Sequence, residues 1–250
     1  MKASTLTAPA RVLMLAALTL AVAPSPGSAQ NGAFDEAGLF FELNNTDGDL
    51  GIHAEIDGED WKRLVIKAPN RRRELLEVRT RGRLREQGLT ELRFESAEPT
   101  FDELSPEEFF ERFPEGSYEI KGRTLEGDTL VSEVEITHVM PAPPIFTEPP
   151  FAPCDAPVVV APPVTIDWEP VATSHPGLGT PGAVVVDRYE VAIERADLGL
   201  ELFMQLTPDI TSFPVPALFT DAPGVVKYEV LVKATAGNRT AEEGCFEILP

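Results

Sequence analysis

Cysteine, histidine and positive charge are all scarce in this sequence. Its 250 residues include two Cys, three His and 21 Lys or Arg against 41 Asp or Glu, a formal net charge of −20. Nucleic acids and anionic membranes attract basic proteins, so this charge disfavours both as partners. His53, His138 and His175 lie in separate segments. Three scattered histidines do not indicate a zinc site, and we expect no metal site.

Motifs that mark common catalytic sites are missing from the sequence as well. There is no G-x-S-x-G nucleophile elbow, no G-x-G-x-x-G loop and no Gly-Lys-Ser/Thr phosphate-binding ending. We therefore expect no catalytic residue, no cofactor and no enzymatic activity. An exported hydrolase is kept as a weak alternative.

Long hydrophobic runs are missing except near the N-terminus. Residues 12–23 are apolar apart from Thr19, and they are preceded by two basic residues and followed by prolines and the small pair Ser28 and Ala29. A membrane-spanning helix needs about 20 apolar residues, whereas a secretory signal peptide has a basic start, a shorter apolar run and small residues at its exit. We predict a signal peptide over residues 1–29. The mature protein would be secreted or periplasmic, without stable membrane insertion.

The two cysteines, Cys154 and Cys245, are predicted to form one disulfide. Exported proteins mature in an oxidising compartment, where two cysteines are most simply bridged to each other. The bridge would close a loop of nearly the whole C-terminal domain, which is worth about 4–5 kcal/mol in the chain-entropy model. Two free buried thiols are the alternative.

Short segments that alternate polar and apolar residues dominate residues 34–140. Such alternation is typical of strands with one buried face. One helix is predicted in SPEEFFERF (105–113), where Ser105 can cap the N-terminus and Pro106 suits the first helical position. The predicted strands are 39–44, 51–57, 61–69, 74–80, 89–96, 116–124 and 129–140. We expect an all-β fold of two tandem β-sandwiches, with one short helix in the first.

A proline-rich stretch, PAPPIFTEPPFAP (141–153), separates two regions of strand-like sequence. Proline fixes φ and favours an extended backbone, so the stretch is predicted to be a semi-rigid linker. The predicted domains are an N-terminal β-sandwich at 34–140 and a second domain at 154–250. Each is expected to fold alone.

Three segments of the last hundred residues share a pattern. They are VTIDWEP (164–170), VVVDRYEVAIE (184–194) and VKYEVLVKATAGN (226–238). A Trp-x-Pro strand followed by two Tyr-x-Val strands resembles a fibronectin type III domain. The resemblance implies an immunoglobulin-like sandwich in which Trp168 packs between two sheets and a tyrosine near Tyr228 pins a loop. Residues 172–183, rich in Gly and Pro, would form a flexible loop at one end.

Part of the N-terminal region also resembles a module of exported bacterial proteins that often precedes a fibronectin type III domain. The segments concerned are 88–116 and 122–138. That module has no assigned activity to transfer. The resemblance implies a two-domain layout and a bacterial source.

The loops at residues 44–60 suggest an alternative function, calcium-dependent binding of a carbohydrate or another small ligand. Asn45, Asp47 and Asp49 crowd one turn, and calcium prefers such oxygen ligands. Counted from Asn45, the twelfth position holds Ile56 where an EF-hand needs glutamate, so that pattern fails. A tight turn exposing carboxylates is the simpler interpretation.

Positive charge is concentrated between Lys62 and Arg93. This segment holds 11 of the 21 Lys and Arg residues and four acidic residues, a net +7, whereas the rest of the chain sums to −27. Within it, Arg79, Arg81, Arg83 and Arg85 fall on every second position. On a strand, all four side chains would project from one face.

This arginine stripe has two interpretations. It could be a solvated strand edge whose charge prevents aggregation. It could instead be a docking face for a protein or an anionic glycan, because guanidinium groups pair well with carboxylates and phosphates. The acidic face of a second copy would also fit, giving weak self-association. We expect a non-enzymatic interaction or structural module.

Overall fold

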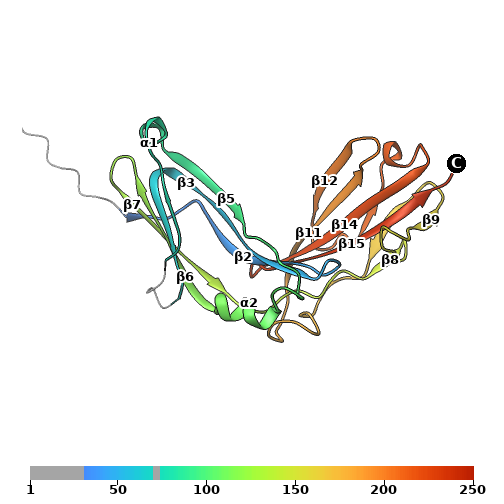
Figure 1. The fold of residues 1–250 in the computed structure, drawn as a ribbon, viewed down its shortest axis with the longest axis horizontal. Coiled ribbons are helices and arrows are strands. Elements are labelled where there is room, and N and C mark those ends of the chain that lie inside the picture. The colour runs from blue at the N-terminus through green and yellow to red at the C-terminus, as the bar shows by residue number, and fades with distance from the viewer. Residues whose placement is uncertain (1–30, 70–73) are drawn as a thin grey trace, which may run out of the picture.

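The computed structural model describes residues 31–69 and 74–250, so the predicted signal peptide lies outside the described residues. The described chain is mostly β-structure, which confirms the all-β prediction. It forms two lobes, residues 31–140 and residues 141–250, each with its own hydrophobic core (Figure 1). We call these the first lobe and the second lobe.

The elements of the first lobe are β1 (Asn31–Gly32), β2 (Glu36–Asn44), β3 (Asp49–Lys67), β4 (Glu74–Arg79), α1 (Arg83–Gln87), β5 (Leu89–Glu95), α2 (Pro106–Arg112), β6 (Gly116–Thr124) and β7 (Thr129–Ile136). Those of the second lobe are β8 (Phe146–Glu148), β9 (Val158–Val160), β10 (Thr165–Trp168), β11 (Val186–Arg195), β12 (Leu200–Leu206), β13 (Ser212–Pro214), a 3₁₀ turn (Ala217–Phe219), β14 (Gly224–Ala234) and β15 (Arg239–Ile248).

One long strand organises the first lobe. Two of the predicted strands are a single strand, β3, whose pairing with β5 and β6 becomes irregular around residues 57–63. Before this break β3 pairs with β2 and β5, and after it with β4 and β6. A strand that bends can serve two layers in this way, because a bulge turns its pairing direction. Gly58 stands at the bend, where a Cβ atom would lie 3.1 Å from the Phe34 ring.

The predicted helix is confirmed as α2. The Ser105 hydroxyl accepts a hydrogen bond from the Glu108 backbone N–H at 3.3 Å, and Pro106 is the first helical residue. This is the expected capping arrangement, which satisfies an otherwise unpaired donor. Phe109 and Phe110 are buried and pack against Phe41 in the first core. A second helical turn, α1, was not predicted.

The second lobe has the packing that the fibronectin type III resemblance implied. Trp168 is 3% exposed and meets the Tyr189 ring edge-on, with ring centroids 5.3 Å apart. The Tyr228 hydroxyl donates to the Pro149 carbonyl oxygen at 3.4 Å. The disulfide between Cys154 and Cys245 is present, which confirms that prediction.

Part of the predicted linker belongs to the second lobe. Residues 146–148 form β8, which pairs with β10 in a three-stranded sheet, β13-β10-β8. Phe146 is buried and packs edge-on against Tyr228, with ring centroids 4.8 Å apart. A spacer with solvated backbone would bury no such side chain. The domain boundaries themselves stay a prediction.

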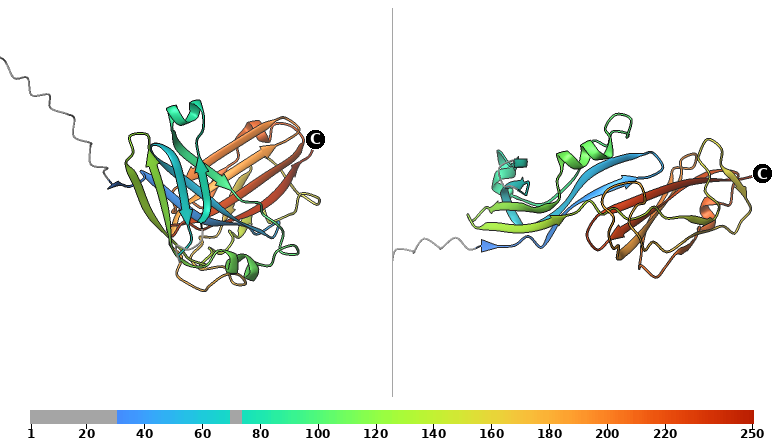
Figure 2. Two further views of the ribbon diagram at one scale, coloured as in Figure 1. Left: turned by 60° about the vertical axis from the view of Figure 1, so that its left-hand side comes forward. Right: turned by 90° about the horizontal axis from the view of Figure 1, so that it is seen from below.

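The two lobes share one sheet. Within the described residues, the strand order is β1-β7-β6-β3-β2-β15-β14-β11-β12, with β4, β5 and β9 attached to its sides. The link is a parallel pairing of residues 42–44 in β2 with residues 239–241 in β15. Figures 1 and 2 show these two strands side by side where the lobes meet.

One buried side chain, Asn238, supports this link with three hydrogen bonds. Its Oδ1 accepts from the Phe41 N–H at 3.0 Å, and its Nδ2 donates to the carbonyl oxygens of Thr137 and Val139 at 2.8 and 3.0 Å. Asn238 is 2% exposed. Three backbone groups of the first lobe therefore depend on one buried amide of the second lobe, because water has little access to them.

The loop at residues 172–183 was predicted to be flexible, but it is docked on the first lobe. Leu178 is 7% exposed and belongs to the first lobe's core. The His175 N–H donates to the Met140 carbonyl at 2.8 Å. Gly179 has a φ of 72°, and a Cβ atom there would lie 2.0 Å from the His138 carbonyl oxygen. Glycine thus permits the close approach that lets Leu178 reach the core.

Replacing Asn238 by alanine should destabilise the whole protein. The change leaves the Phe41 donor and two carbonyl acceptors unpaired in a buried place, which costs about 2–4 kcal/mol. Urea unfolding followed by circular dichroism measures the loss. The matched control is Thr235→Ala, an exposed residue in the same turn, which should change stability by less than about 0.5 kcal/mol. Equal stability of the two variants would show that Asn238 does not hold the link.

Candidate functional site

Basic side chains from three neighbouring strands meet on the outer face of the first lobe. Arg63 in β3 lies opposite Arg79 in β4 and opposite Arg123 in β6. Two residue pairs further along, and therefore on the same face, Lys121 in β6 lies opposite Val65 in β3. Directly opposed side chains of paired strands stand about 5 Å apart and share a face. We call Arg63, Arg79, Lys121 and Arg123 the basic surface.

Two carboxylates, Glu77 and Glu74, offset part of the charge of the basic surface. Glu77 accepts a hydrogen bond from Arg79 at 2.8 Å and another from Arg63. These two hydrogen bonds, that from Arg79 first, hold the pKa of Glu77 below its ordinary value. Arg123 donates to the Thr129 hydroxyl at 3.1 Å. Among the described residues, Lys121 and Arg123 form no ion pair with a carboxylate.

The basic surface borders a shallow hollow of ≈ 430 Å³. Its floor includes Val65, which is only 3% exposed between the basic side chains. The aliphatic stems of Arg and Lys cover apolar surface while their charged ends stay in water. Lys67 also lines the hollow and pairs with Glu119 at 3.4 Å. The site can hold an anionic group near several cations, and it contains no arrangement for covalent chemistry among the described residues.

The predicted arginine stripe is wrong as a structure. Strand β4 ends at Arg79, and Arg83 and Arg85 lie in α1. The four arginines are all exposed, but they do not share one strand face. Gly82 has a φ of 56°, in the left-handed region that glycine adopts at little cost. The chain leaves β3 after Thr80, whose N–H donates to the Lys62 carbonyl oxygen, and returns to pair with β3 at Leu89.

A sequence signal for this turn was present. Gly82 and Gly88 bracket five residues, RLREQ, that are good helix formers. Both glycines have positive φ. Arg63, Lys121 and Arg123 were missed for another reason, because nothing in the sequence states that β6 pairs with β3.

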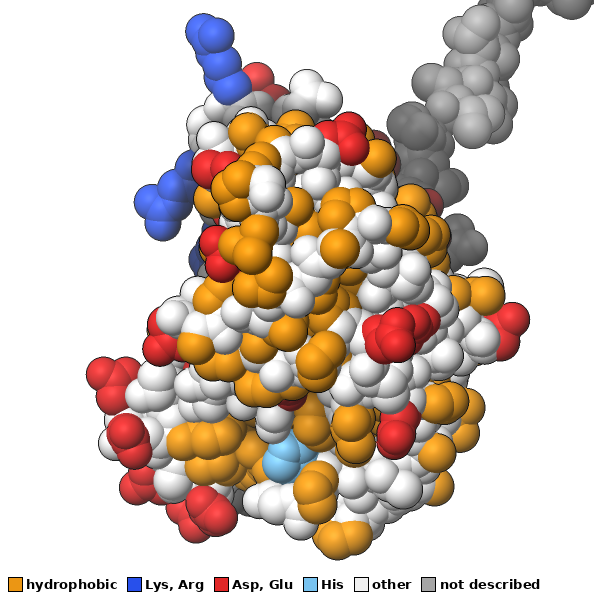
Figure 3. All heavy atoms as spheres, turned by 90° about the vertical axis from the view of Figure 1, so that its right-hand side faces the viewer, with side chains coloured by type: hydrophobic (Ala, Val, Ile, Leu, Met, Phe, Trp, Pro, Cys, Tyr) orange, Lys and Arg blue, Asp and Glu red, His pale blue; other side chains and the backbone are white. Residues whose placement is uncertain are grey.

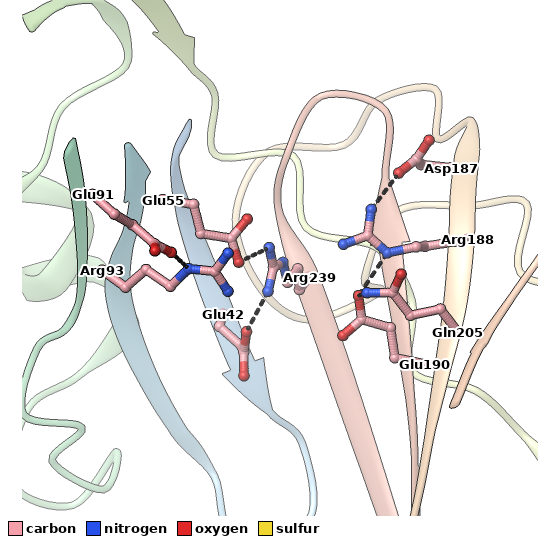
Figure 4. A network of polar contacts seen from close by, with 9 residues as sticks. All are labelled: Glu42, Glu55, Glu91, Arg93, Asp187, Arg188, Glu190, Gln205 and Arg239. Atoms are coloured by element: carbon pink, nitrogen blue, oxygen red, sulfur yellow. Dashed lines mark hydrogen bonds and ion pairs between the residues drawn. The ribbon is translucent and has the colours of Figure 1, made fainter. Parts of the chain in front are cut away.

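A second charged cluster links the lobes on the outer face of the shared sheet (Figure 4). Arg239, the first residue of β15, donates to Glu55 at 2.8 Å and lies 3.6 Å from Glu42. Its guanidinium carbon lies 3.8 Å from the centre of the Phe40 ring. Arg239 is 7% exposed. These contacts tie β15 to β2 and β3, so we assign this cluster a structural role.

Buried carboxylates accumulate beside this cluster. Burial, followed by the charges of Glu243 and Glu42, raises the pKa of Glu229 to about 7. Burial and the charge of Glu98 raise the pKa of Asp49 to about 6. Both acids favour the protonated form in the folded protein, so ionising them costs stability.

Both lobes are acidic overall, and residues 31–140 carry 14 Lys or Arg against 26 Asp or Glu, a net −12. The second lobe carries five Lys or Arg against fifteen Asp or Glu, a net −10. The face in Figure 3, seen from the second lobe's side, shows many carboxylates and apolar side chains, with Lys and Arg projecting at its upper left edge. The basic surface is thus a local exception on an acidic protein.

The loops proposed for calcium are engaged in protein contacts. The Asn45 amide donates to Glu242 at 2.6 Å, and the Thr46 hydroxyl accepts from the Glu243 N–H at 2.8 Å. Within residues 31–69 and 74–250, no group of three or more His, Cys, Asp or Glu side chains is placed to hold a metal ion. The same residues include no helix with the length and hydropathy of a membrane span.

No protein-family model matches the sequence, and no curated protein is significantly similar to it. Among solved structures, a tetra-tandem repeat of a large adhesion protein resembles it weakly, with a TM-score of 0.29 and 8% identity over 86% of this chain and 50% of that chain. The chicken CNTN1 FN1–FN3 domains have a TM-score of 0.34 and 12% identity over 90% of this chain and 69% of that chain. A two-domain fibronectin type III segment of chicken tenascin has a TM-score of 0.26 and 12% identity over 86% of this chain and 98% of that chain. The chain spans half the length of the first. Likeness at these TM-scores does not establish what this chain does.

Stability should fall as the pH rises from 5.5 to 8. In the folded protein Glu229 keeps its proton up to about pH 7, whereas its ordinary pKa is 4.5. Its contribution to the free energy of unfolding is therefore complete below its ordinary pKa of 4.5 and is lost as the pH rises through its raised pKa of about 7. Glu229→Gln, which mimics the protonated acid, should therefore raise stability at pH 8 by about 1–2 kcal/mol, allowing for partial exposure.

Urea midpoints at both pH values, for wild type and variant, measure this effect. The control is Glu194→Gln, an exposed position on β11, which should keep the wild-type pH dependence. If Glu229→Gln also keeps it, the buried carboxylate is not its source.

Proposed function

We propose that this protein is a non-catalytic, exported interaction module that docks an anionic partner on the basic surface. The observation that carries the proposal is the row of Arg79, Arg63 and Arg123 on three adjacent strands, with one shared carboxylate, Glu77. Like charges so close repel one another, and an anionic partner relieves that repulsion. In a chain of net charge −20, random placement does not favour such a row.

Export is supported by the disulfide. Cys154 and Cys245 are bridged across a sequence separation of 91, and such bridges persist in oxidising compartments. The amino-terminal sequence pattern supports the same location, either secreted or periplasmic. An exported module with no catalytic cluster among its described residues fits a role in binding.

The recognised chemistry is a series of carboxylate, sulfate or phosphate groups on a flexible or extended partner. The basic surface is open to solvent, with the Arg63 and Arg79 side chains 44% and 58% exposed. An open surface of this kind suits contacts that arise mainly from charge and weaken with salt. An anionic glycan and an acidic protein segment both present such groups.

Binding to heparin and to polyglutamate, measured at low and moderate salt, tests the proposal and separates the two sources. The triple variant Arg63→Gln, Lys121→Gln, Arg123→Gln should weaken binding to the preferred polymer at least about tenfold, equal to about 1.4 kcal/mol. Its matched control is Arg81→Gln, Arg83→Gln, Arg85→Gln, which removes the same charge from the α1 end. The control should lose less than about threefold.

Two results would contradict the proposal. Equal losses in both triple variants would show that net charge, and not the basic surface, attracts the polymers. Failure of the wild-type protein to bind either polymer at low salt would remove the anionic partner altogether.

A further inference from the structure

Strand β12 forms an open end of the shared sheet. It pairs with β11 on one side, and none of the described strands pairs with its other side. Its seven residues, Leu200–Leu206, therefore present a row of backbone N–H and C=O groups to solvent. An open row of this kind is a template for another strand.

The other edges are protected in ways that β12 is not. Strands β4, β5 and β7 carry charged side chains, in the sequences ELLEVR, LTELRFE and TLVSEVEI. Strand β1 has two residues, and β8, β9 and β13 have three each. Charge and shortness both discourage edge-to-edge pairing. In contrast β12, LELFMQL, has one ionisable side chain, Glu201. Phe203 and Met204 on it are 60% and 39% exposed.

The sequence of β12 is symmetric about Phe203. Leu200 and Leu206 lie three residues from Phe203. The polar pair two residues from it is Glu201 and Gln205, and the apolar pair next to it is Leu202 and Met204. In an antiparallel pair of two copies centred on Phe203, every apolar side chain would face an apolar one. Glu201 would face Gln205 of the second copy. A carboxylate opposite an amide can be hydrogen-bonded, whereas two opposed carboxylates would repel.

We propose that two copies of this protein associate through β12, as an antiparallel pair with Phe203 at the twofold axis. The pairing satisfies the open backbone groups and covers both exposed Phe203 rings. Within one chain the residue opposite Phe203 is Ala192, which is too small to cover the ring. A twofold axis closes the assembly at a dimer, because each copy has used its β12 edge.

The expected dimer is weak and is favoured by salt. A seven-residue strand pair covers less surface than the roughly 1,200 Å² of a stable interface, so dissociation in the micromolar range or weaker is expected. Each second lobe has a net charge of −10, and salt screens the repulsion between the two copies. Contact between the basic surface of one copy and the acidic lobe of another would respond to salt in the opposite direction.

Sedimentation velocity over a range of protein concentrations, at about 20 mM and about 0.5 M NaCl, measures the association. Gln205→Lys places a lysine opposite Glu201 of the other copy twice per dimer, and should lower the dissociation constant about threefold or more. Gln205→Glu opposes two carboxylates twice, and should raise it by a similar factor. The control Glu194→Gln lies on β11, away from the β12 edge, and alters the net charge by the same amount as Gln205→Lys. It should change the dissociation constant by less than about twofold.

Three outcomes overturn the proposal. The protein could remain monomeric at every concentration and salt. Its association could weaken as salt rises, which would assign it to the basic surface. The Gln205 variants could shift the dissociation constant in the same direction, which would exclude the register centred on Phe203.

Discussion

The parallel pairing of β2 with β15 determines where every other surface of the molecule lies. It spans three residues of each strand. It is supported by Asn238, which satisfies three backbone groups that water cannot easily reach, and by Arg239, which pairs with Glu55. Without it, β2 and β15 would each end in an open edge over this stretch. With it, two sets of strands become one sheet, and the sheet has fewer edges to protect.

The same pairing fixes the basic surface relative to the second lobe. It places the second lobe at one end of the molecule and the basic surface of Arg63, Arg79, Lys121 and Arg123 at the far part of the first lobe. Because both lobes are fixed, an anionic partner on that surface would be held away from the carboxylates of the second lobe. The carboxylates that remain near the joint, such as Glu229, carry raised pKa values as a consequence of their burial.

Much of the fold could be predicted from local sequence physics, but the pairing of β2 with β15 could not. Alternation located the strands, Ser105 and Pro106 located α2, and the two cysteines indicated their own bridge. Of the predicted arginines only Arg79 belongs to the basic surface, because β4 ends at Arg79 and α1 begins at Arg83. The loop around Leu178 is rich in Gly and Pro, which predicts flexibility. Its burial depends on contacts with the first lobe, whose residues lie more than 30 positions away in the chain.

The central claim is that the two lobes behave as one body, against the sequence-based expectation that each folds alone. Differential scanning calorimetry of the intact mature chain tests it most directly. We predict a single transition whose calorimetric and van't Hoff enthalpies agree, because the shared sheet couples the two cores. Two resolved transitions, each with the enthalpy of about half the chain, would contradict the account and would make the joint a contact between independent domains.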